Sequence, residues 1–526
     1  MTHRDDRQLG WPFIIVAAAY VAWAALFIFR SSVVAGDGTR YFCLFDDAMI
    51  SARYAWNLVH GHGLVWNPGE YVEGITNLLW VLVMAPFMAM FGKAGALLAV
   101  QCVGLGLMLV NGLLAGHILV NITGGRGPVP RGGLMAAGLV AGVAYYPLSY
   151  WALMGMETGL LAVLVTLSVL LAFRFADGGR PTHAYGMAVA LGLAFVARPD
   201  GALYTPVMFG YCLVARWRGV GPVRAVGDLV GPGFVFVAVF GAVFLFRHGY
   251  YGEWLPNTYT LKVAGSTLAT RLADGRVFVG YFLREAAPLL VAAALATAWR
   301  FNGKKALLAA LFVVLLAYQA WNGGDAWFLW RMQAPTIPFL LLLACVAILD
   351  VTARMTARRS GAALLAALLV ALAVANQRFL PEVMFQRVPS AVAANAASVS
   401  TALALDDVLD DQATIGVFWA GAIPYFTERY AIDFLGKADK RIAALPPDTS
   451  GAVGRWGMVT LAGHNKYDLE YSIKELRPTY IQGFNWGRQN LMGWVAGRYR
   501  NIRAPNGATM LLDRESPHVR WERLGG

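Results

Sequence analysis

The stretch WPFIIVAAAYVAWAALFIFR, residues 11–30, decides the fold of this chain. Its only charged residue is the last one, and its length matches the roughly 20 residues that a helix needs to cross a bilayer. No small-residue cleavage site separates it from the next polar stretch. We therefore predict a retained membrane span rather than a signal peptide.

The composition of the whole chain points the same way. Its 526 residues are 58% hydrophobic and 14% charged, whereas soluble domains average about 25% charged residues. The net charge of +12 indicates basic cytoplasmic loops more readily than nucleic-acid binding. We thus expect membrane lipids as partners and no nucleic acid. The four cysteines show no pair with metal-binding spacing, so they indicate neither disulfides nor a zinc site.

Further apolar segments predict about 11 spanning helices. They lie at 11–30, 95–120, 133–152, 158–173, 183–198, 201–217, 228–247, 279–299, 305–320, 333–350 and 360–377. The segment 76–91 is shorter, and whether it crosses decides the sidedness of every later loop. If it lies at the interface, all downstream basic clusters face the same side as the N-terminus, as the positive-inside rule requires. We therefore predict a multi-pass protein of the cell (inner) membrane with a cytoplasmic N-terminus.

The polar regions of the chain fall on the outer side in this topology. The first outer loop, 31–94, is long enough to hold interfacial helices. After Asn376 the composition changes and no further span follows. Runs at 413–419 and 478–483 predict strands, and charged segments at 390–411 and 468–475 predict helices. We predict two domains: a membrane module, 1–377, and a soluble extracytoplasmic α/β domain, 378–526.

An acid pair, Asp46-Asp47, stands after the first span. Two adjacent carboxylates at a membrane face are costly unless they are hydrated, paired or bound to a cation. Either they favour the N-terminal dipole of a helix, or they provide a general base or cation ligand at the mouth of a membrane cavity. The sequence favours neither of these two interpretations over the other. Arg53 follows at a spacing that can reach back to the pair.

Two later outer loops carry further acids. Glu157 stands at a helix start, where it is either a partner of the helix dipole or a site residue. Arg198 and Asp200 join two spans through a tight turn, and such a pair is structural more often than catalytic.

The last two outer loops between spans each carry a candidate cation. Lys262 ends an aromatic stretch, and a lysine facing a lipid phosphate would act as a point-charge anchor. Asp325 and Arg331 share one loop, where the simplest interpretation pairs them with each other.

The order of these motifs resembles the GT-C fold membrane glycosyltransferases that use polyprenyl-phosphate sugars, above all the mycobacterial terminal arabinofuranosyltransferases and their relatives. The resemblance runs from about residue 40 to 480 and departs at Arg198-Pro199-Asp200, where the family has an acid one carbon longer, and just after Asp325. The motifs that carry it are Asp46-Asp47, Arg53-Tyr54, Gly61-x-Gly63 through Glu73, Gly155-Met156-Glu157, Arg198-Pro199-Asp200, Gly249-Tyr250-Tyr251-Gly252 with Pro256 and Lys262, Gly323-Gly324-Asp325 with Arg331, Ile432 to Gly436, and Gly463-His464-x-Lys466.

This resemblance implies a GT-C type polytopic α-helical fold and an inverting transfer of a sugar from a polyprenyl phosphate to a glycan or protein acceptor. Arabinofuranose is the sugar we favour. It implies Asp46 or Asp47 as the base. No cofactor is required, while a divalent cation at the acid pair stays open. The other implied residues are Lys262, Arg198, Arg331 and Tyr251 for the donor phosphate, and Arg53, Glu73, Glu157, Asp200, Asp325 and His464 for substrate.

Three alternatives stand beside this interpretation. A GT-C enzyme could transfer mannose or another sugar. A lipid or solute transporter would also suit many spans, but it would place its acids near the middle of spans, often with inverted repeats. A scaffold built around the tail would tolerate replacement of the first-loop acids. The aromatic side chains of the tail favour core packing over sugar stacking; they are Trp419, Tyr425, Trp486 and Trp494.

Overall fold

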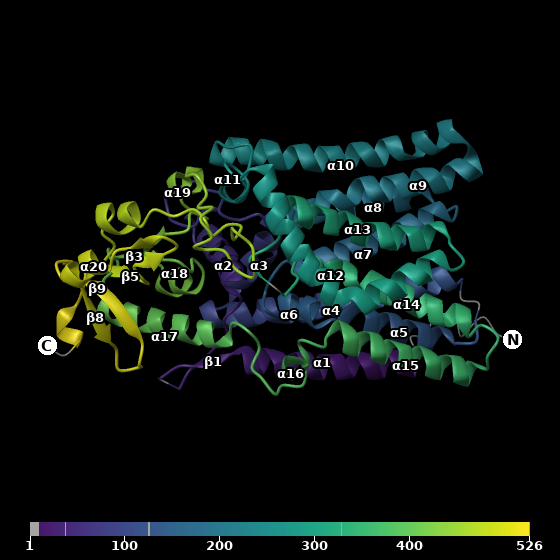
Figure 1. Cartoon of the computed structure of the whole chain (residues 1–526), viewed down its shortest axis with the longest axis horizontal. Coiled ribbons are helices and arrows are strands. Elements are labelled where there is room, and N and C mark those ends of the chain that lie inside the picture. The colour runs from purple at the N-terminus through teal and green to yellow at the C-terminus, as the bar shows by residue number, and fades with distance from the viewer. Residues whose placement is uncertain (1–9, 37, 125–126, 328, 525–526) are drawn as a thin grey trace.

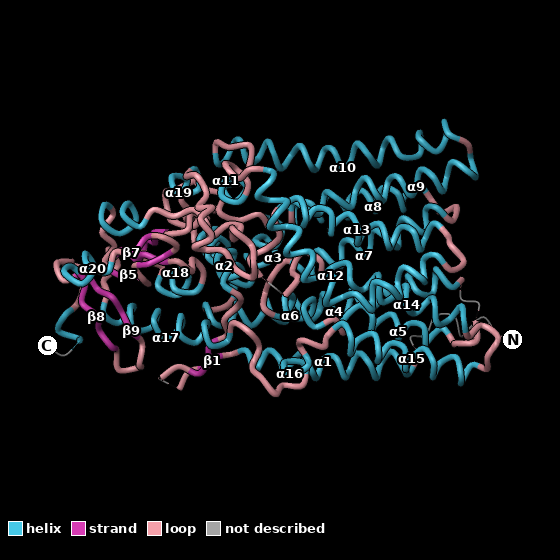
Figure 2. The backbone as a smooth tube through the Cα atoms, in the orientation of Figure 1, coloured by secondary structure: helices cyan, strands magenta, loops and turns pink. Residues whose placement is uncertain are grey.

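The computed structural model describes residues 10–36, 38–124, 127–327 and 329–524. Long helices run side by side through one half of the molecule, and a small sheet with short helices occupies the other half (Figure 1). The helical bundle and the sheet occupy opposite ends of an elongated molecule (Figure 2).

Helices dominate the described chain. The longer ones are α1 (Trp11–Ser31), α2 (Asp46–Val59), α3 (Leu78–Met90), α4 (Lys93–Thr123), α5 (Arg131–Val143), α6 (Tyr146–Leu153), α7 (Thr158–Ala176), α8 (Pro181–Ala197), α9 (Tyr204–Val220), α10 (Pro222–Tyr251), α12 (Leu268–Ala298), α13 (Gly303–Asn322), α14 (Ile337–Val351), α15 (Ala357–Ala375) and α17 (Val392–Val408). The shorter ones are α11 (Asn257–Lys262), α16 (Leu380–Val383), α18 (Ala422–Thr427), α19 (Lys440–Ala444) and α20 (Met492–Arg498).

Each of the predicted spans falls on helical structure. Within the described residues, eight helices are long and apolar enough to cross a membrane. A ninth follows if α5 and α6, bent by 67°, form one span. α8 and α9 have 17 residues each, at the lower limit of spanning length. No described helix after α15 is long and apolar enough to cross.

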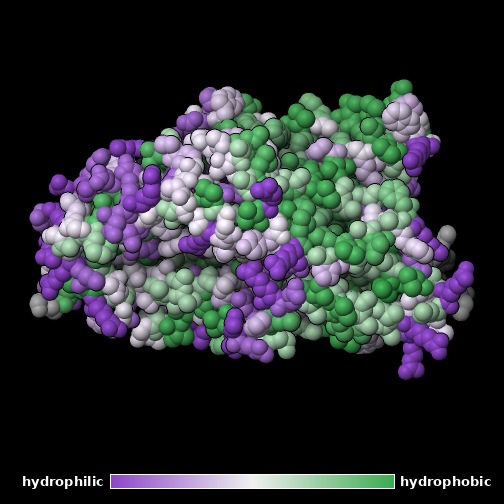
Figure 3. All heavy atoms as spheres, in the orientation of Figure 1, coloured by the Kyte–Doolittle hydropathy of each residue, from purple (hydrophilic) through white to green (hydrophobic). Residues whose placement is uncertain are grey.

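The apolar segment predicted to stay at the interface forms α3. Its 13 residues reach only about 20 Å, short of the roughly 30 Å of a bilayer core. The bundle itself is apolar outside as well as inside. On α10, Val230, Phe234 and Val237 are all exposed, and Figure 3 shows hydrophobic residues gathered on the bundle half of the surface. An exposed apolar surface of this extent is typical of a protein that lies in a membrane.

The sheet after α17 mixes parallel and antiparallel strands. Its order is β4 (Tyr430–Asp433), β3 (Thr414–Val417), β5 (Tyr480–Ile481), β9 (Thr509–Asp513) and β8 (Tyr499–Arg503). β3 is parallel to both β4 and β5, and β9 is antiparallel to β5 and β8. The predicted strands and helices of the tail are all present, the segment at 468–475 as a π-helix, Glu470–Glu475. The strands are β1 (Val33–Val34), β2 (Arg40–Tyr41), β3 (Thr414–Val417), β4 (Tyr430–Asp433), β5 (Tyr480–Ile481), β6 (Asn485–Trp486), β7 (Gln489–Asn490), β8 (Tyr499–Arg503) and β9 (Thr509–Asp513).

The N-terminal end of α2 meets the carboxyl ends of the parallel strands. β3 ends at Val417 and leads to Gly421, whose backbone N–H donates to Asp46 Oδ1 at 3.0 Å. A Cβ atom at Gly421 would lie 2.2 Å from the Asp46 carbonyl oxygen, so only glycine fits there. The loops at this edge of an α/β sheet commonly carry binding residues. The tail is thereby held directly against the acid pair.

Candidate functional site

A cavity of about 240 Å³ opens where the first loop and the tail meet the ends of the spans that lie nearest to them. Its walls combine apolar and aromatic side chains from α8, α10 and α13 with a cluster of charged groups. Five cations and three carboxylates line it: Arg198, Arg247, Lys262, Arg331, Lys437, Asp47, Glu157 and Asp200. Charge of this density at the edge of a membrane marks a functional site rather than a packing core.

Asp47 joins the cations from the last interspan loop and the tail. Arg331 donates from Nη1 to Asp47 Oδ2 at 2.8 Å, and Lys437 donates from Nζ to Oδ1 at 2.9 Å. Burial alone would raise the pKa of Asp47, but Lys437, Arg331 and Lys262 together hold that pKa far below its usual range. The carboxylate is therefore ionised at neutral pH, with a cation on each oxygen.

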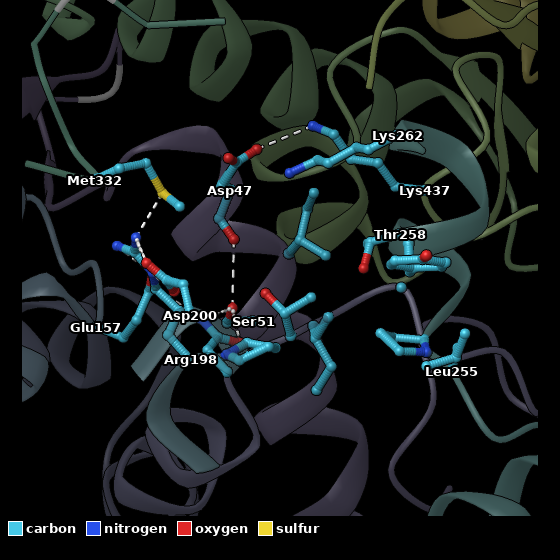
Figure 4. A pocket seen from close by; sticks show the side chains of 18 of the residues that line it. Asp47, Ser51, Glu157, Arg198, Asp200, Leu255, Thr258, Lys262, Met332 and Lys437 are labelled. Carbon is cyan, nitrogen blue, oxygen red and sulfur yellow. Dashed lines mark hydrogen bonds and ion pairs between the residues drawn. The ribbon is translucent and has the colours of Figure 1, made fainter. Parts of the chain in front are cut away.

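Lys262 is the cavity cation without a protein partner. Its side chain extends toward Asp47 beside Lys437 (Figure 4). Among the described residues, its ammonium has no hydrogen bond or ion pair within reach. Burial lowers its pKa, and the cations Arg331 and Lys437 lower it further against the pull of nearby Asp325 and Asp47. An unpaired ammonium in this position can bind an anion that enters the cavity.

The Arg198 and Asp200 pair predicted from the turn is present. Arg198 donates from Nε and Nη2 to the two carboxylate oxygens of Asp200 at 2.7 and 2.6 Å. Its Nη1 is buried without a hydrogen bond, 3.8 Å from Glu157 Oε1. Glu157 accepts from Asn77 Nδ2 at 3.0 Å. All of these side chains line the cavity, so the pair is structural and also part of the wall.

Lys437 was not among the residues expected from the sequence. The tail motif that carries the resemblance runs from Ile432 to Gly436 and ends one residue before Lys437. The Asp433 carboxylate accepts from the backbone N–H groups of Leu435 and Ala438 at 3.0 and 2.8 Å, which folds the chain after β4 into a tight loop. Asn257 Nδ2 donates to the carbonyl of Lys437 at 3.0 Å. The signal that could have found Lys437 is its position directly after the Ile432 to Gly436 motif, four residues beyond the end of β4.

Arg247 was also missed, because it lies inside an apolar segment that reads as a plain span. It donates from Nε to both carboxylate oxygens of Glu73 at 2.9 Å. Burial raises the pKa of Glu73 to about 7, although Arg247 opposes the shift. Glu73 therefore contacts a cavity residue without lining the cavity itself.

Asp46 points away from the cavity, toward the tail. Its Oδ1 accepts from Gly421, and its Oδ2 is buried without a hydrogen-bond partner. Burial raises the pKa of Asp46 to about 6; Lys437 lowers it and Asp47 adds to the rise. The two neighbouring carboxylates thus have opposite environments, and only Asp47 lines the cavity.

Arg53 does not reach back to the acid pair, so that expectation is wrong. Its guanidinium donates to the carbonyls of Trp66 and Arg429 at 2.5 and 2.9 Å, to Asn67 Oδ1 at 3.0 Å, and to the carbonyl of Pro424. Because these acceptors come from the first loop and the tail, Arg53 joins the two regions. No pattern in the sequence predicts these contacts, because the acceptors lie up to 376 positions away.

Replacing Arg53 with Met is expected to destabilise the fold without a specific effect on ligand binding. The buried carbonyls that the guanidinium satisfies would be left unpaired, at a cost of about 3 kcal/mol or more. We expect the melting temperature in detergent to fall by about 5 °C or more. Arg455→Met, at an exposed position, is the matched control. An unchanged melting temperature for Arg53→Met would contradict the conclusion that Arg53 holds the first loop and the tail together.

Three other expected site residues lie near the cavity but do not line it. Tyr251 donates its hydroxyl to the Leu64 carbonyl at 2.8 Å and so fixes the first loop. Asp325 Oδ1 accepts from Arg331 Nη2 at 3.3 Å, and its Oδ2 is buried and unpaired. Burial, with Lys437 next, lowers the pKa of His464 to about 3, so its imidazole is neutral.

The acid pair is a poor fit for a divalent cation. Both oxygens of Asp47 already accept from cations, and Asp46 faces the opposite way. Within the described residues, no group of three or more His, Cys, Asp or Glu side chains converges as metal ligands would. We therefore derive no step through a metal.

The tail matches a family model. The model is described as a domain of unknown function, DUF8728, and it covers residues 390–513. Two curated relatives are each named terminal β-(1→2)-arabinofuranosyltransferase. That of Mycobacterium tuberculosis is 30% identical over 254 residues, 45% of this chain and 37% of the relative. That of Corynebacterium glutamicum is 27% identical over 279 residues, 48% of this chain and 38% of the relative. The matched part thus spans less than two fifths of either relative, and it confirms the resemblance drawn from the motifs.

A solved structure extends the likeness to nearly the whole chain. ArnT from Cupriavidus metallidurans in the apo state matches with a TM-score of 0.59 and 14% identity, over 97% of this chain and 98% of that one. ArnT bound to undecaprenyl phosphate matches with a TM-score of 0.51 and 12% identity, over 80% and 85%. This likeness shows the fold and confirms the predicted architecture: a polytopic helical GT-C type module followed by an α/β tail.

Proposed function

We propose that the protein is an inverting glycosyltransferase that moves a sugar from a polyprenyl phosphate to a glycan or protein acceptor at the outer face of the membrane. Arabinofuranose is the sugar we favour, and mannose or another sugar is the runner-up. The proposal includes a cytoplasmic N-terminus, and a division of the chain into a membrane module, 1–377, and an extracytoplasmic domain, 378–526. The two arabinofuranosyltransferase relatives and the ArnT complex with undecaprenyl phosphate support it.

The observation that carries the proposal is the unpaired Lys262 facing the ionised Asp47 in a cavity walled by spans. An acceptor hydroxyl needs a group that takes its proton, and a lipid phosphate needs fixed cations as it leaves. Both kinds of group stand in one cavity, at the height where a lipid tail can remain among the spans. A transporter would instead place such acids in the middle of the spans.

The chemistry is a single displacement. The acceptor oxygen attacks the anomeric carbon while its proton passes to Asp47, and the bond from that carbon to the phosphate oxygen breaks. The electron pair leaves with the phosphate, where Lys262, Arg331 and Lys437 stabilise the developing charge. A monophosphate leaving group already close to several cations needs no metal for this step.

Donor binding also prepares the base. In the free protein the cations on Asp47 make its carboxylate a weak proton acceptor. A phosphate that enters beside Lys262 competes for Lys437 and Arg331 and neutralises their charge. We therefore expect the pKa of Asp47 to rise when the donor is bound, which ties proton uptake to the presence of the leaving group.

The experiment that tests the function offers the purified full chain a panel of polyprenyl-phosphoryl sugars with a small glycan acceptor. Transfer from the arabinofuranosyl donor supports the whole proposal. Transfer only from a mannosyl or another donor keeps the enzyme class and rejects our choice of sugar. If no lipid-phosphate sugar is consumed, and Asp47→Asn behaves like the wild type in cells, the transporter or scaffold interpretation replaces ours.

A further inference from the structure

A second cavity, of about 330 Å³, lies at the end of the helical bundle away from the tail. Helix α4 separates it from the site around Asp47. The first residue of α4, Lys93, donates to the carbonyl of Phe426 in the tail at 2.6 Å, whereas its last residue, Thr123, lines the second cavity. The 31 residues of α4 span about 46 Å. Among the described residues, none lines both cavities, so the second one has its own ligand chemistry.

The lining of the second cavity divides into an apolar floor and a polar rim. The floor is made of buried side chains from α5, from the segment before it and from α14: Val129, Leu134, Val346 and Leu349. The rim comes from the turn between α12 and α13 and from the last turn of α14: Arg300, Asn302 and Asp350. A cavity with this division suits an amphipathic ligand, with a charged head and an apolar body.

Arg300 is a lining cation that the protein leaves loosely paired. The other lining cation, Lys305, is buried, and its Nζ donates to Asp350 Oδ2 at 2.9 Å. The same Nζ donates to the carbonyls of Ala296 and Trp299 at 3.1 and 2.8 Å, so all of its N–H groups are used. Among the described residues, the guanidinium of Arg300 has only Asp350 Oδ1 as a polar partner, at 3.8 Å. Two cations and one carboxylate leave a net charge of +1, which a singly charged anion would balance.

The backbone at Arg300 indicates that its side chain is needed there. Arg300 directly follows Trp299, the C-cap of α12, and has a φ of +51°. Glycine is the usual residue in this left-handed conformation after a helix, because a Cβ atom is strained there. An arginine at this position therefore costs stability. Costly backbone conformations gather at functional sites, and this one carries a guanidinium that lines a cavity.

The turn that carries Arg300 lies at the height of lipid headgroups. Helix α12, which ends just before it, is long and apolar enough to cross a membrane. Trp299 is 58% exposed, and tryptophan is enriched where spans meet the membrane surface. Figure 3 shows hydrophilic residues gathered at this end of the bundle. Basic pockets between spans at this height can bind anionic lipid headgroups.

We propose that the second cavity binds the headgroup of an anionic phospholipid, a phosphodiester with one negative charge. The guanidinium of Arg300 and the amide of Asn302 donate to the phosphate oxygens, and the apolar floor receives the part of the lipid next to the phosphate. Asn302 has a donor to spare. Its Oδ1 accepts from the backbone N–H of Lys305 at 3.0 Å, and its Nδ2 has no partner among the described residues. A bound lipid would tie the turn after α12 to α14, so the stability of the bundle would depend on membrane composition. The inference is independent of the proposed function.

The test counts the lipid molecules bound to the delipidated full chain in detergent by native mass spectrometry. Dioleoyl phosphatidylglycerol is the anionic probe, and the zwitterionic dioleoyl phosphatidylcholine is the comparison. We expect the anionic lipid to bind about ten-fold more tightly. Arg300→Gly should remove this preference. Asn302→Asp should remove it too, because it keeps the cap on α13 and adds a negative charge. Arg358→Gln is the matched control, since Arg358 is exposed in the first turn of α15 and does not line the second cavity.

A thermal melt separates lipid binding from folding. Without lipid, Arg300→Gly should melt at the same or a higher temperature than the wild type, because glycine adopts a φ of +51° without strain. Phosphatidylglycerol should raise the melting temperature of the wild type and of Arg358→Gln, but not that of Arg300→Gly.

Equal binding of the two lipids by the wild type would overturn the proposal. So would a preference for phosphatidylglycerol that survives in both Arg300→Gly and Asn302→Asp, or one that is lost only in Arg358→Gln, which would assign the lipid to the outer basic surface. Glycerol phosphate distinguishes the sources of the phosphate. If it displaces phosphatidylglycerol at equal concentration, the ligand is a soluble phosphate and the lipid is overturned. If only a large excess displaces the lipid, the apolar floor contributes as proposed.

Discussion

Asp47→Asn is expected to abolish sugar transfer while leaving the protein folded. Asn cannot take the proton of the acceptor hydroxyl, and a positioned base contributes about 10²–10⁴-fold to a rate. The amide keeps the size of the carboxyl group, but it no longer neutralises Arg331 and Lys437. We therefore expect kcat to fall by about 10³-fold, with tighter rather than weaker binding of undecaprenyl phosphate. The measurement is single-turnover transfer from the active lipid-linked donor, with a thermal melt to establish folding.

Asp46→Asn provides the contrast within the acid pair. Asp46 does not line the cavity, and its pKa is raised to about 6, so burial of its charge costs stability as the pH rises above the ordinary carboxyl range. We expect this variant to melt at the same or a higher temperature near pH 7.5 and to keep most of the turnover at saturating acceptor. A folded Asp46→Asn without activity, beside an active Asp47→Asn, would exchange the roles of the two acids.

Lys437→Met is expected to weaken donor binding and to move the acid limb of the pH profile upward. The lysine contacts Asp47 and lines the cavity, and a charge-assisted contact is worth about 1.5–3 kcal/mol, so the donor KM should rise about ten-fold or more. Lys437 is also the largest electrostatic influence that lowers the pKa of Asp47. Without it that pKa rises, the carboxylate is protonated at a higher pH, and kcat/KM falls earlier on acidification.

The matched control for that experiment is Lys440→Met. Lys440 lies three residues further on, has an exposed side chain (45%), and pairs with Glu253 outside the cavity at 3.6 Å. It should leave the donor KM and the pH profile as in the wild type. If Lys437→Met raises the donor KM but leaves the acid limb in place, the lysine binds phosphate without tuning the base. If neither quantity changes, Lys437 belongs to the framework only.

Much of the architecture could be predicted because lipid imposes a simple rule on sequence. A helix that crosses a bilayer must be apolar for about 20 residues, so the spans are visible one by one. The positive-inside rule then fixed the status of the segment 76–91, and α3 is indeed too short to cross. The acids and cations of the predicted outer loops could also be recognised as candidate site residues, because a charged group at a membrane face is costly and is often functional.

Only the tertiary structure decided which of those groups meet. Asp47 and Lys437 are 390 positions apart, and no periodicity links them. Arg247 belongs to an apolar helix, α10, and its charge is balanced by Glu73 from the first loop. The sequence does not show that these two residues meet. Asp46 and Asp47 are neighbours in sequence, yet successive side chains on a helix point about 100° apart, so one enters the cavity and the other meets the tail. The sequence by itself determined the membrane spans and the kinds of chemical group at the ends of the spans that lie nearest the tail. The packing of the tail on α2 determined the site, because contacts across hundreds of residues depend on how the elements fit together.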